Sequence, residues 1–145
     1  MKSVNKSVLI WYSAEEMFAL VTDVDAYPQF LPWCDHASVL ARDEQGMKAE
    51  VGISISRIRQ TFITRNDHVP GRQVNMKLID GPFSHLEGCW TFTPVGEGQR
   101  ACRVELKLDY AFRSSTLAAL VGPVFDRIAG SLVDAFVKRA EQVYG

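Results

Sequence analysis

The fold is indicated by the stretch CRVELKLDYAF, residues 102–112, and by the segment after it, SSTLAALVGPVFDRIAGSLVDAFVKRAEQVY, residues 114–144. In the first stretch apolar and charged residues alternate, which is typical of a strand with one buried face. In the second, apolar residues recur every three or four positions, which is typical of an amphipathic helix. A helix over residues 115–144 would span about 45 Å at ~1.5 Å per residue. Pro123 inside it predicts a kink or a break, because proline cannot donate the helical hydrogen bond.

Shorter segments of the same two kinds precede this pair. The sequence predicts strands at 3–11, 47–56, 58–66, 74–78 and 86–92, with turns at 69–72, 80–82 and 96–98. Ser13 and Glu16 form a capping box that should begin a helix running to about Thr22. A second short helix is expected at 24–30, with Pro28 in its first turn.

Strands joined by such short connections form an antiparallel meander. The predicted fold class is therefore α+β. We expect a curved antiparallel sheet of about seven strands wrapped around the long C-terminal helix, with two short helices after the first strand.

Composition restricts the class of protein. A length of 145 residues favours a single domain, 1–145, and 47% hydrophobic with 23% charged residues is typical of a globular chain. The net charge of −1 gives no overall attraction to DNA or RNA. Three cysteines with no Cys-x-x-Cys pair favour neither a disulfide framework nor a zinc site, so we expect a reducing cytoplasmic location. The N-terminus lacks the sustained apolar segment of a secretion signal.

A long helix cannot touch every part of a strongly curved sheet, so we expect a space between the two. Comparable spaces hold ligands in lipocalin-like barrels. Aromatic and aliphatic side chains would line this space, and its ligand should therefore be apolar. The candidate lining residues are Phe30, Trp33, Phe83, Trp90, Phe112, Leu117, Val121 and Phe125.

Each candidate has a plainer structural alternative. Phe30 and Trp33 could equally be ordinary core residues. Pro82 stiffens the turn before Phe83, which favours an exposed aromatic lid over a side chain folded inward. The stretch 117–125 carries more apolar surface than one packed face needs. A buried helix start is still favoured over membrane docking, because few basic residues flank it.

Four motifs resemble the coenzyme Q-binding START-domain family: YPQFLPWC at 27–34, DGPF at 80–83, LEGCWTF at 86–92 and DAFVKRA at 134–140. The resemblance covers essentially the whole chain and implies the helix-grip fold. It implies that ubiquinone or a related isoprenoid lipid is bound in the cavity to support respiration, with no catalysis and no required cofactor. In a bacterial branch, members are described as toxins that bind the large ribosomal subunit and block subunit association. Other START-like relatives are polyketide cyclases or dehydratases.

Basic residues suggest one further contact. Arg57, Arg59 and Arg65 fall on one face of a predicted strand, with Arg72 nearby. They could contact phosphate, either in ribosomal RNA or in a lipid head group. A solvated outer face is the favoured alternative, because the net charge gives no support for such a contact.

An enzyme is the third hypothesis. The inward positions are almost wholly apolar, and no nucleophile, base and orienting group occur at usable spacing. Asp35 and His36 are neighbours, which a strand would point to opposite faces. We therefore predict no catalytic residue and no metal ligand. The expected partner is an isoprenoid lipid, with the large ribosomal subunit as the alternative and no DNA. Peripheral contact with the inner membrane stays open.

Overall fold

A single seven-stranded sheet forms the body of the protein. The computed structural model describes residues 1–55, 57–98 and 100–145, so Ser56, the last residue of the predicted strand 47–56, lies outside it. All neighbouring strands pair antiparallel, in the order β1-β7-β6-β5-β4-β3-β2. The strands are β1 Lys2–Ile10, β2 Cys34–Asp43, β3 Gly46–Ile55, β4 Ile58–Val69, β5 Gln73–Asp80, β6 Phe83–Pro94 and β7 Cys102–Phe112.

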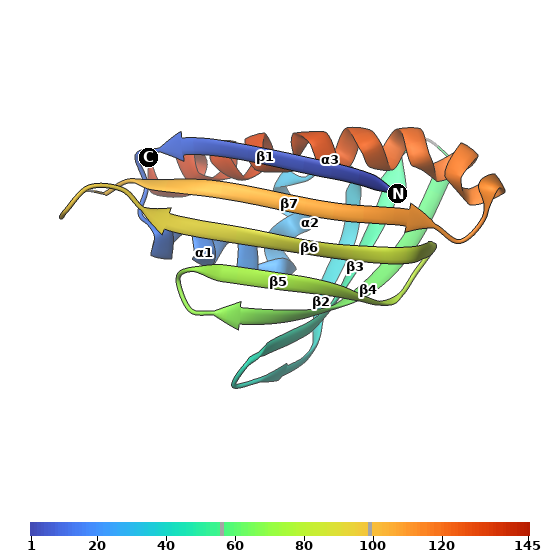
Figure 1. The fold of residues 1–145 in the computed structure, drawn as a ribbon, viewed down its shortest axis with the longest axis horizontal. Helices are drawn as coiled ribbons and strands as arrows, with labels where there is room; N and C mark the ends of the chain where they lie inside the picture. The colour runs from blue at the N-terminus through green and yellow to red at the C-terminus, as the bar shows by residue number, and fades with distance from the viewer. Residues whose placement is uncertain (56, 99) are drawn as a thin grey trace.

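The helices lie together on one face of this sheet (Figure 1). They are α1 Ala14–Thr22, the single 3₁₀ turn η1 Val24–Ala26, α2 Tyr27–Phe30 and α3 Ser115–Tyr144. The strands curve around α3, which runs along the upper edge of this view behind β1. The predicted α+β helix-grip architecture is confirmed.

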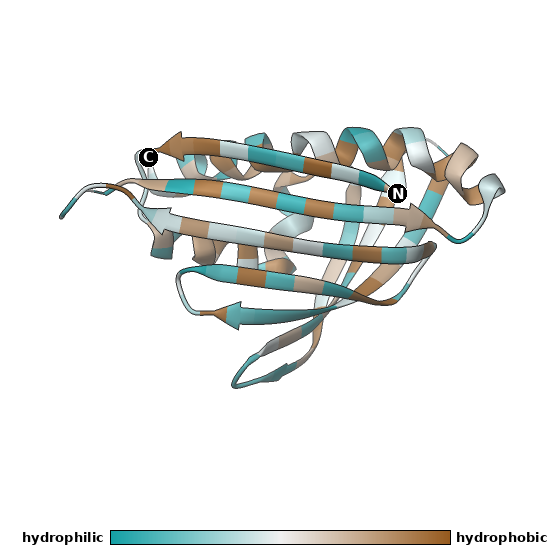
Figure 2. Ribbon diagram, viewed as in Figure 1, coloured by the Kyte–Doolittle hydropathy of each residue, from teal (hydrophilic) through white to brown (hydrophobic). Residues whose placement is uncertain are grey.

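Alternation along the strands separates the two faces of the sheet. In β7, Val104, Leu106 and Leu108 are buried, while Arg103 and Lys107, which alternate with them, are exposed. The same striping of apolar and polar residues is visible along the neighbouring strands (Figure 2). The buried stripe faces α3, and its removal from water is the main stabilising term, at about 25 cal/mol per Å².

Side-chain caps set the starts of two helices. The Ser13 hydroxyl accepts a hydrogen bond from the Glu16 amide at 3.0 Å, and the Glu16 carboxylate accepts one from the Ser13 amide at 2.9 Å. This confirms the predicted capping box. The Ser114 hydroxyl accepts from the Leu117 amide at 3.1 Å and begins α3. Pro28 lies in the first turn of α2, as predicted.

One strand, β2, has no counterpart among the strands located from sequence. Its pairing with β3 is interrupted twice, between Cys34 and His36 and between Val39 and Ala41. Each irregularity breaks the two-residue period on which strand prediction depends. The first also makes the expectation for Asp35 and His36 wrong, because their side chains meet, with 2.8 Å between Nδ1 of His36 and Oδ1 of Asp35.

Of the kink or break predicted at Pro123, the break is wrong, because α3 continues through Pro123 from Ser115 to Tyr144. Pro123 faces solvent, whereas Val121 and Phe125 on either side of it are buried against the sheet. Packing of these neighbours compensates for the hydrogen bond that proline cannot donate.

Candidate ligand-binding cavity

A cavity of about 90 Å³ lies between α3 and the concave face of the sheet. Sites for small organic ligands usually measure about 300–1,000 Å³, so the wall must move apart to admit one. Its lining comes from η1, α2, strands β3 to β7 and α3, with Trp33 from the segment before β2: Val24, Tyr27, Trp33, Ala49, Val51, Ile53, Phe62, Thr64, Asn66, Met76, Leu86, Trp90, Leu106, Leu108, Phe125, Ile128, Leu132 and Phe136.

Three of the eight candidate lining residues lie in this wall: Trp33, Trp90 and Phe125. Trp90 on β6 packs edge-on against Phe136 of α3, with ring centroids 5.3 Å apart. Phe125 packs in the same way against Tyr110 at 4.6 Å. These contacts hold α3 against the sheet at both ends of the cavity. A role in ligand binding stays a prediction for all eight residues.

The other five candidates lie outside the wall. Phe30 packs against Phe136, with the Arg139 guanidinium 4.9 Å above its ring. Phe83, Phe112, Leu117 and Val121 pack together near the start of α3 instead. There the helix rests directly on the ends of β6 and β7, and the large side chains fill the space that would otherwise belong to the cavity.

Phe83 is not an exposed lid. Its side chain is only 2% exposed, and its ring stacks on Phe112 with 5.1 Å between centroids. Phe125 contacts it from α3 at 4.9 Å. The aromatic cluster of Phe83, Tyr110, Phe112 and Phe125 therefore closes one end of the cavity. The prediction of an exposed lid at Phe83 is therefore wrong, and the alternative of a side chain folded inward is correct.

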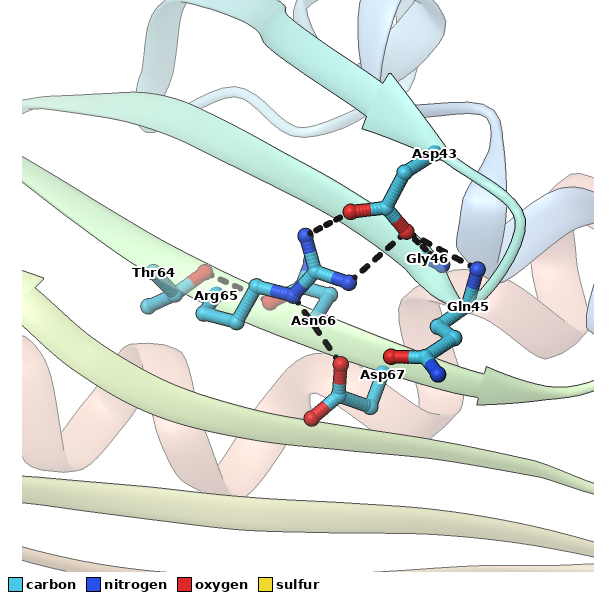
Figure 3. Close-up of polar contacts among 7 residues, drawn as sticks. All are labelled: Asp43, Gln45, Gly46, Thr64, Arg65, Asn66 and Asp67. Carbon is cyan, nitrogen blue, oxygen red and sulfur yellow. Dashed lines mark hydrogen bonds and ion pairs between the residues drawn. The ribbon is translucent and has the colours of Figure 1, made fainter.

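Two polar residues, which the sequence interpretation missed, interrupt the apolar wall. Thr64 is 5% exposed and Asn66 is 7% exposed, and both lie on the concave face of β4. The Thr64 hydroxyl donates a hydrogen bond of 2.7 Å to Oδ1 of Asn66 (Figure 3). The two-residue period that turns Phe62 inward also turns Thr64 and Asn66 inward, so this signal was present in the sequence.

The wall is electrically neutral. Tyr27 is its one ionisable residue among those the structure describes. Burial raises the pKa of Tyr27 well above its usual value, and its hydroxyl donates to the Val21 carbonyl. His68 follows Asn66 by two positions on β4 but does not line the cavity. Burial lowers its pKa, so the imidazole is neutral at pH 7.

The three candidate arginines do not form one open basic face. Arg65 is bound by two carboxylates, Asp43 at 2.8 Å and Asp67 at 2.9 Å (Figure 3). Its guanidinium holds the pKa of Asp43 far below the usual range. Arg72 pairs with Glu15 at 2.8 Å. Arg57, in the turn before β4, and Arg59, at the start of β4, are exposed.

The start of α3 is only partly buried, so the favoured interpretation of a buried start is wrong for its outer side. Leu120 is 60% exposed, and Ala118 and Ala119 beside it are exposed too. Leu117 is half-buried and Val121 fully buried against the aromatic cluster. By length and composition alone α3 could cross a membrane, a property that helices in the core of a domain often share.

Two relatives with curated names align over nearly all of this chain. The ribosome association toxin RatA of Vibrio cholerae serotype O1 is 46% identical over 145 residues, which cover 100% of this chain and 99% of the toxin. The mitochondrial coenzyme Q-binding protein COQ10 homolog B of Xenopus laevis is 29% identical over 143 residues. That alignment covers 97% of this chain and 59% of the longer relative.

A solved structure and a family model agree with the architecture. The Zhui aromatase/cyclase from Streptomyces sp. R1128 superposes with a TM-score of 0.85 at 16% identity, covering 99% of this chain and 96% of that one. At this identity the likeness concerns the fold alone. Residues 10–137 match the model described as polyketide cyclase / dehydrase and lipid transport. The chain therefore belongs to the START-like polyketide cyclase/dehydrase and lipid transport family, with relatives named RatA and COQ10.

Proposed function

We propose that the protein binds ubiquinone or a related isoprenoid lipid in this cavity, without catalysing a reaction on it, and thereby supports respiration. The observation that carries this proposal is the composition of the wall. Its aromatic and aliphatic side chains are interrupted only by Tyr27 and the polar residues Thr64 and Asn66. Burying an isoprenoid tail against such a wall is favourable by about 25 cal/mol per Å², whereas a charged ligand would lose its hydration without compensation.

One relative supports a binding role, and the wall of the cavity argues against catalysis. It is named for binding coenzyme Q, and its alignment covers nearly all of this chain. The aromatase/cyclase shares the fold at 16% identity, which does not carry its chemistry to this chain. Acid–base catalysis needs a titratable group beside the reacting atoms, and the neutral wall described above supplies Tyr27 alone.

Gly88 on β6 lets two flexible side chains pack directly over the sheet beside the cavity. A side chain at this position would come within 2.8 Å of the terminal methyl group of Met76 and 2.9 Å of a Leu108 methyl group. The two methyl groups therefore occupy the space that the missing side chain leaves. Because methionine has three rotatable side-chain bonds, Met76 can turn aside when a ligand enters.

Filling the cavity tests the proposal. Ala49 lies in the wall on β3, opposite Thr64 on β4. Ala49→Leu should occupy the empty space, lower the affinity for a short-chain ubiquinone at least tenfold and destabilise the protein by no more than about 3 kcal/mol. Isothermal titration calorimetry measures the affinity and thermal unfolding the stability. Ala41→Leu on the exposed part of β2 is the matched control. Unchanged quinone affinity in Ala49→Leu would contradict the proposal.

A second candidate function is binding to the large ribosomal subunit so that the two subunits do not associate. The observation in its favour is the 46% identity, over the whole chain, to a relative named as a ribosome association toxin. The exposed Arg57 and Arg59 beside the β3–β4 turn are the candidate RNA contacts. Arg65 is excluded from this role because Asp43 and Asp67 neutralise it.

Sucrose gradients of ribosomes with added protein test this candidate. The protein should reduce the 70S peak, and the effect should weaken steeply as salt rises, since phosphate contacts release counterions. The double variant Arg57→Gln/Arg59→Gln should lose most of the effect. The control variant Arg72→Gln should retain it, because Arg72 is already paired with Glu15 in the wild type. A 70S peak that added protein leaves unchanged would exclude this function.

For location we propose the cytoplasm, with peripheral contact at the inner membrane. The exposed apolar start of α3 supports such a contact. Of the two basic residues that flank it, Arg113 pairs with Asp80 at 3.2 Å and Arg127 is exposed. Apolar surface with basic neighbours is the usual composition of interfacial helices.

A further inference from the structure

Asn66 is a polar side chain that the protein itself satisfies only in part. It is 7% exposed and lines the cavity. A side-chain amide offers one acceptor oxygen and two N–H donors. The oxygen accepts a hydrogen bond from Thr64 at 2.7 Å, whereas no described residue accepts one from the amide nitrogen.

The surroundings of Asn66 supply no further partner. Its neighbours across the sheet are Met47 on β3 and Met76 on β5. Thr64 likewise lies between Ala49 and Leu78. Among the described residues, the fully buried side-chain nitrogen or oxygen atom without a partner is Nε2 of His68, so the Asn66 amide nitrogen is not fully enclosed by protein. A donor that borders the cavity and has no protein acceptor points to a ligand that supplies one.

We infer that Asn66, held in orientation by Thr64, binds the head group of the ligand by donating an amide N–H to an oxygen of its ring. Because Thr64 occupies the amide oxygen, the group left facing the cavity is a donor. A carbonyl or methoxy oxygen of a quinone ring satisfies it, and a hydrocarbon cannot. This inference rests on the proposed lipid-binding function and adds the position and chemistry of its polar contact.

The inference also orients the ligand. Asn66 lies toward η1, where Val24 packs beside Met47. The aromatic cluster closes the cavity near the start of α3. With the ring at Asn66, the isoprenoid tail lies against the apolar remainder of the wall, between Trp90 of β6 and Ile128 of α3.

A purely structural role for the pair predicts a different outcome from a binding role. If the hydrogen bond served only to fix β4, replacing both residues would destabilise the protein and leave ligand selectivity unchanged. If the pair serves the ligand, apolar replacements of similar shape should leave the ligand-free protein at least as stable, because removing both partners leaves no orphan group.

The decisive variant is the double substitution Thr64→Val/Asn66→Leu. Calorimetric titration uses two probes, a ubiquinone with a ten-carbon alkyl tail and squalene, which has no polar head. The affinity for the quinone should fall about tenfold, as expected for one lost hydrogen bond to a buried oxygen, while the affinity for squalene stays within twofold. The melting temperature of the ligand-free variant should not fall. Asn75→Leu on the exposed face of β5 is the matched control.

The remaining outcomes separate the two levels of the proposal. Unchanged quinone affinity in the double variant overturns the head-group site, yet leaves the cavity as an apolar binding site. A wild-type protein that binds neither probe overturns the proposed function and this inference with it. If the variant does not fold, nuclear magnetic resonance of the wild type decides. The Asn66 side-chain amide signals should shift on adding the quinone and not on adding squalene, and equal shifts would overturn the inference.

Discussion

Glu16 has two roles at the start of α1. It completes the capping box with Ser13, and its carboxylate also binds the Arg100 guanidinium at 2.6 Å. Arg100 is the main reason that the pKa of Glu16 falls to about 2, against about 4.3 in an unfolded chain. A lowered pKa in the folded state means that ionised Glu16 stabilises the protein above about pH 4.3. This contribution is lost as the pH falls toward 2.

The variant Glu16→Gln isolates the charge, because glutamine at this position still completes the capping box. The free energy of unfolding should fall by about 1 kcal/mol at pH 7, a modest value because the ion pair is partly exposed to solvent. The difference should shrink as the pH falls from 4.3 to 2, where the wild-type carboxylate becomes protonated. Urea unfolding at several pH values measures this, with Glu44→Gln as control, because Glu44 is exposed and forms no ion pair with a described residue. A difference that is the same at pH 2 and pH 7 would contradict the assignment.

For single residues, the sequence predicts which face of a strand a side chain lies on but not what it contacts there. Period-two alternation on β4 is enough to turn Phe62, Thr64 and Asn66 inward. It cannot tell which inward residues meet empty space and which meet another side chain. Phe83 is the counterexample: its turn looks like an exposed lid in the sequence, but the rings of Phe112 and Phe125 cover it from distant parts of the chain.

At the scale of elements, sequence patterns predicted those helices and strands whose formation depends on neighbouring residues. The capping box at Ser13, the alternation of β7 and the two ends of α3 follow from neighbouring residues alone. The strand β2 was not predicted, because its irregular pairing with β3 breaks the alternation of apolar and polar residues. The continuity of α3 through Pro123 was not predicted. Packing of the helix against the sheet outweighs one missing hydrogen bond, and a local sequence pattern contains no information about that packing.

The start of α3 carries the prediction for membrane contact. Leu120 is exposed there, so Leu120→Ser removes apolar surface without disturbing the core. Binding to vesicles of phosphatidylglycerol and phosphatidylethanolamine should weaken about threefold to tenfold, the range expected when one large apolar side chain stays in water. Vesicle flotation measures it.

Leu40→Ser is the control for this comparison, because Leu40 is similarly exposed on β2, away from α3. If both variants bind vesicles as well as the wild type does, the start of α3 is not the surface that contacts the membrane.

At the scale of the whole molecule, the cavity arises from curvature. The helix α3 meets the sheet firmly at the aromatic cluster near its start and again where Phe136 packs on Trp90. Between these contacts the curved strands recede from the helix and leave about 90 Å³. Element order predicted that such a space would exist. Its position and small size depend on side chains that are far apart in sequence, so no local pattern could predict them.

The central claim is that an isoprenoid quinone occupies this cavity, and the most direct measurement is mass spectrometry of an organic extract. The protein would be purified without detergent from cells that make ubiquinone, so that any quinone found was bound to the protein during purification. We predict close to one ubiquinone per chain in the extract of the wild type, and far less in that of Ala49→Leu. An extract without quinone, from a protein that also takes up none when ubiquinone is added, would contradict the claim.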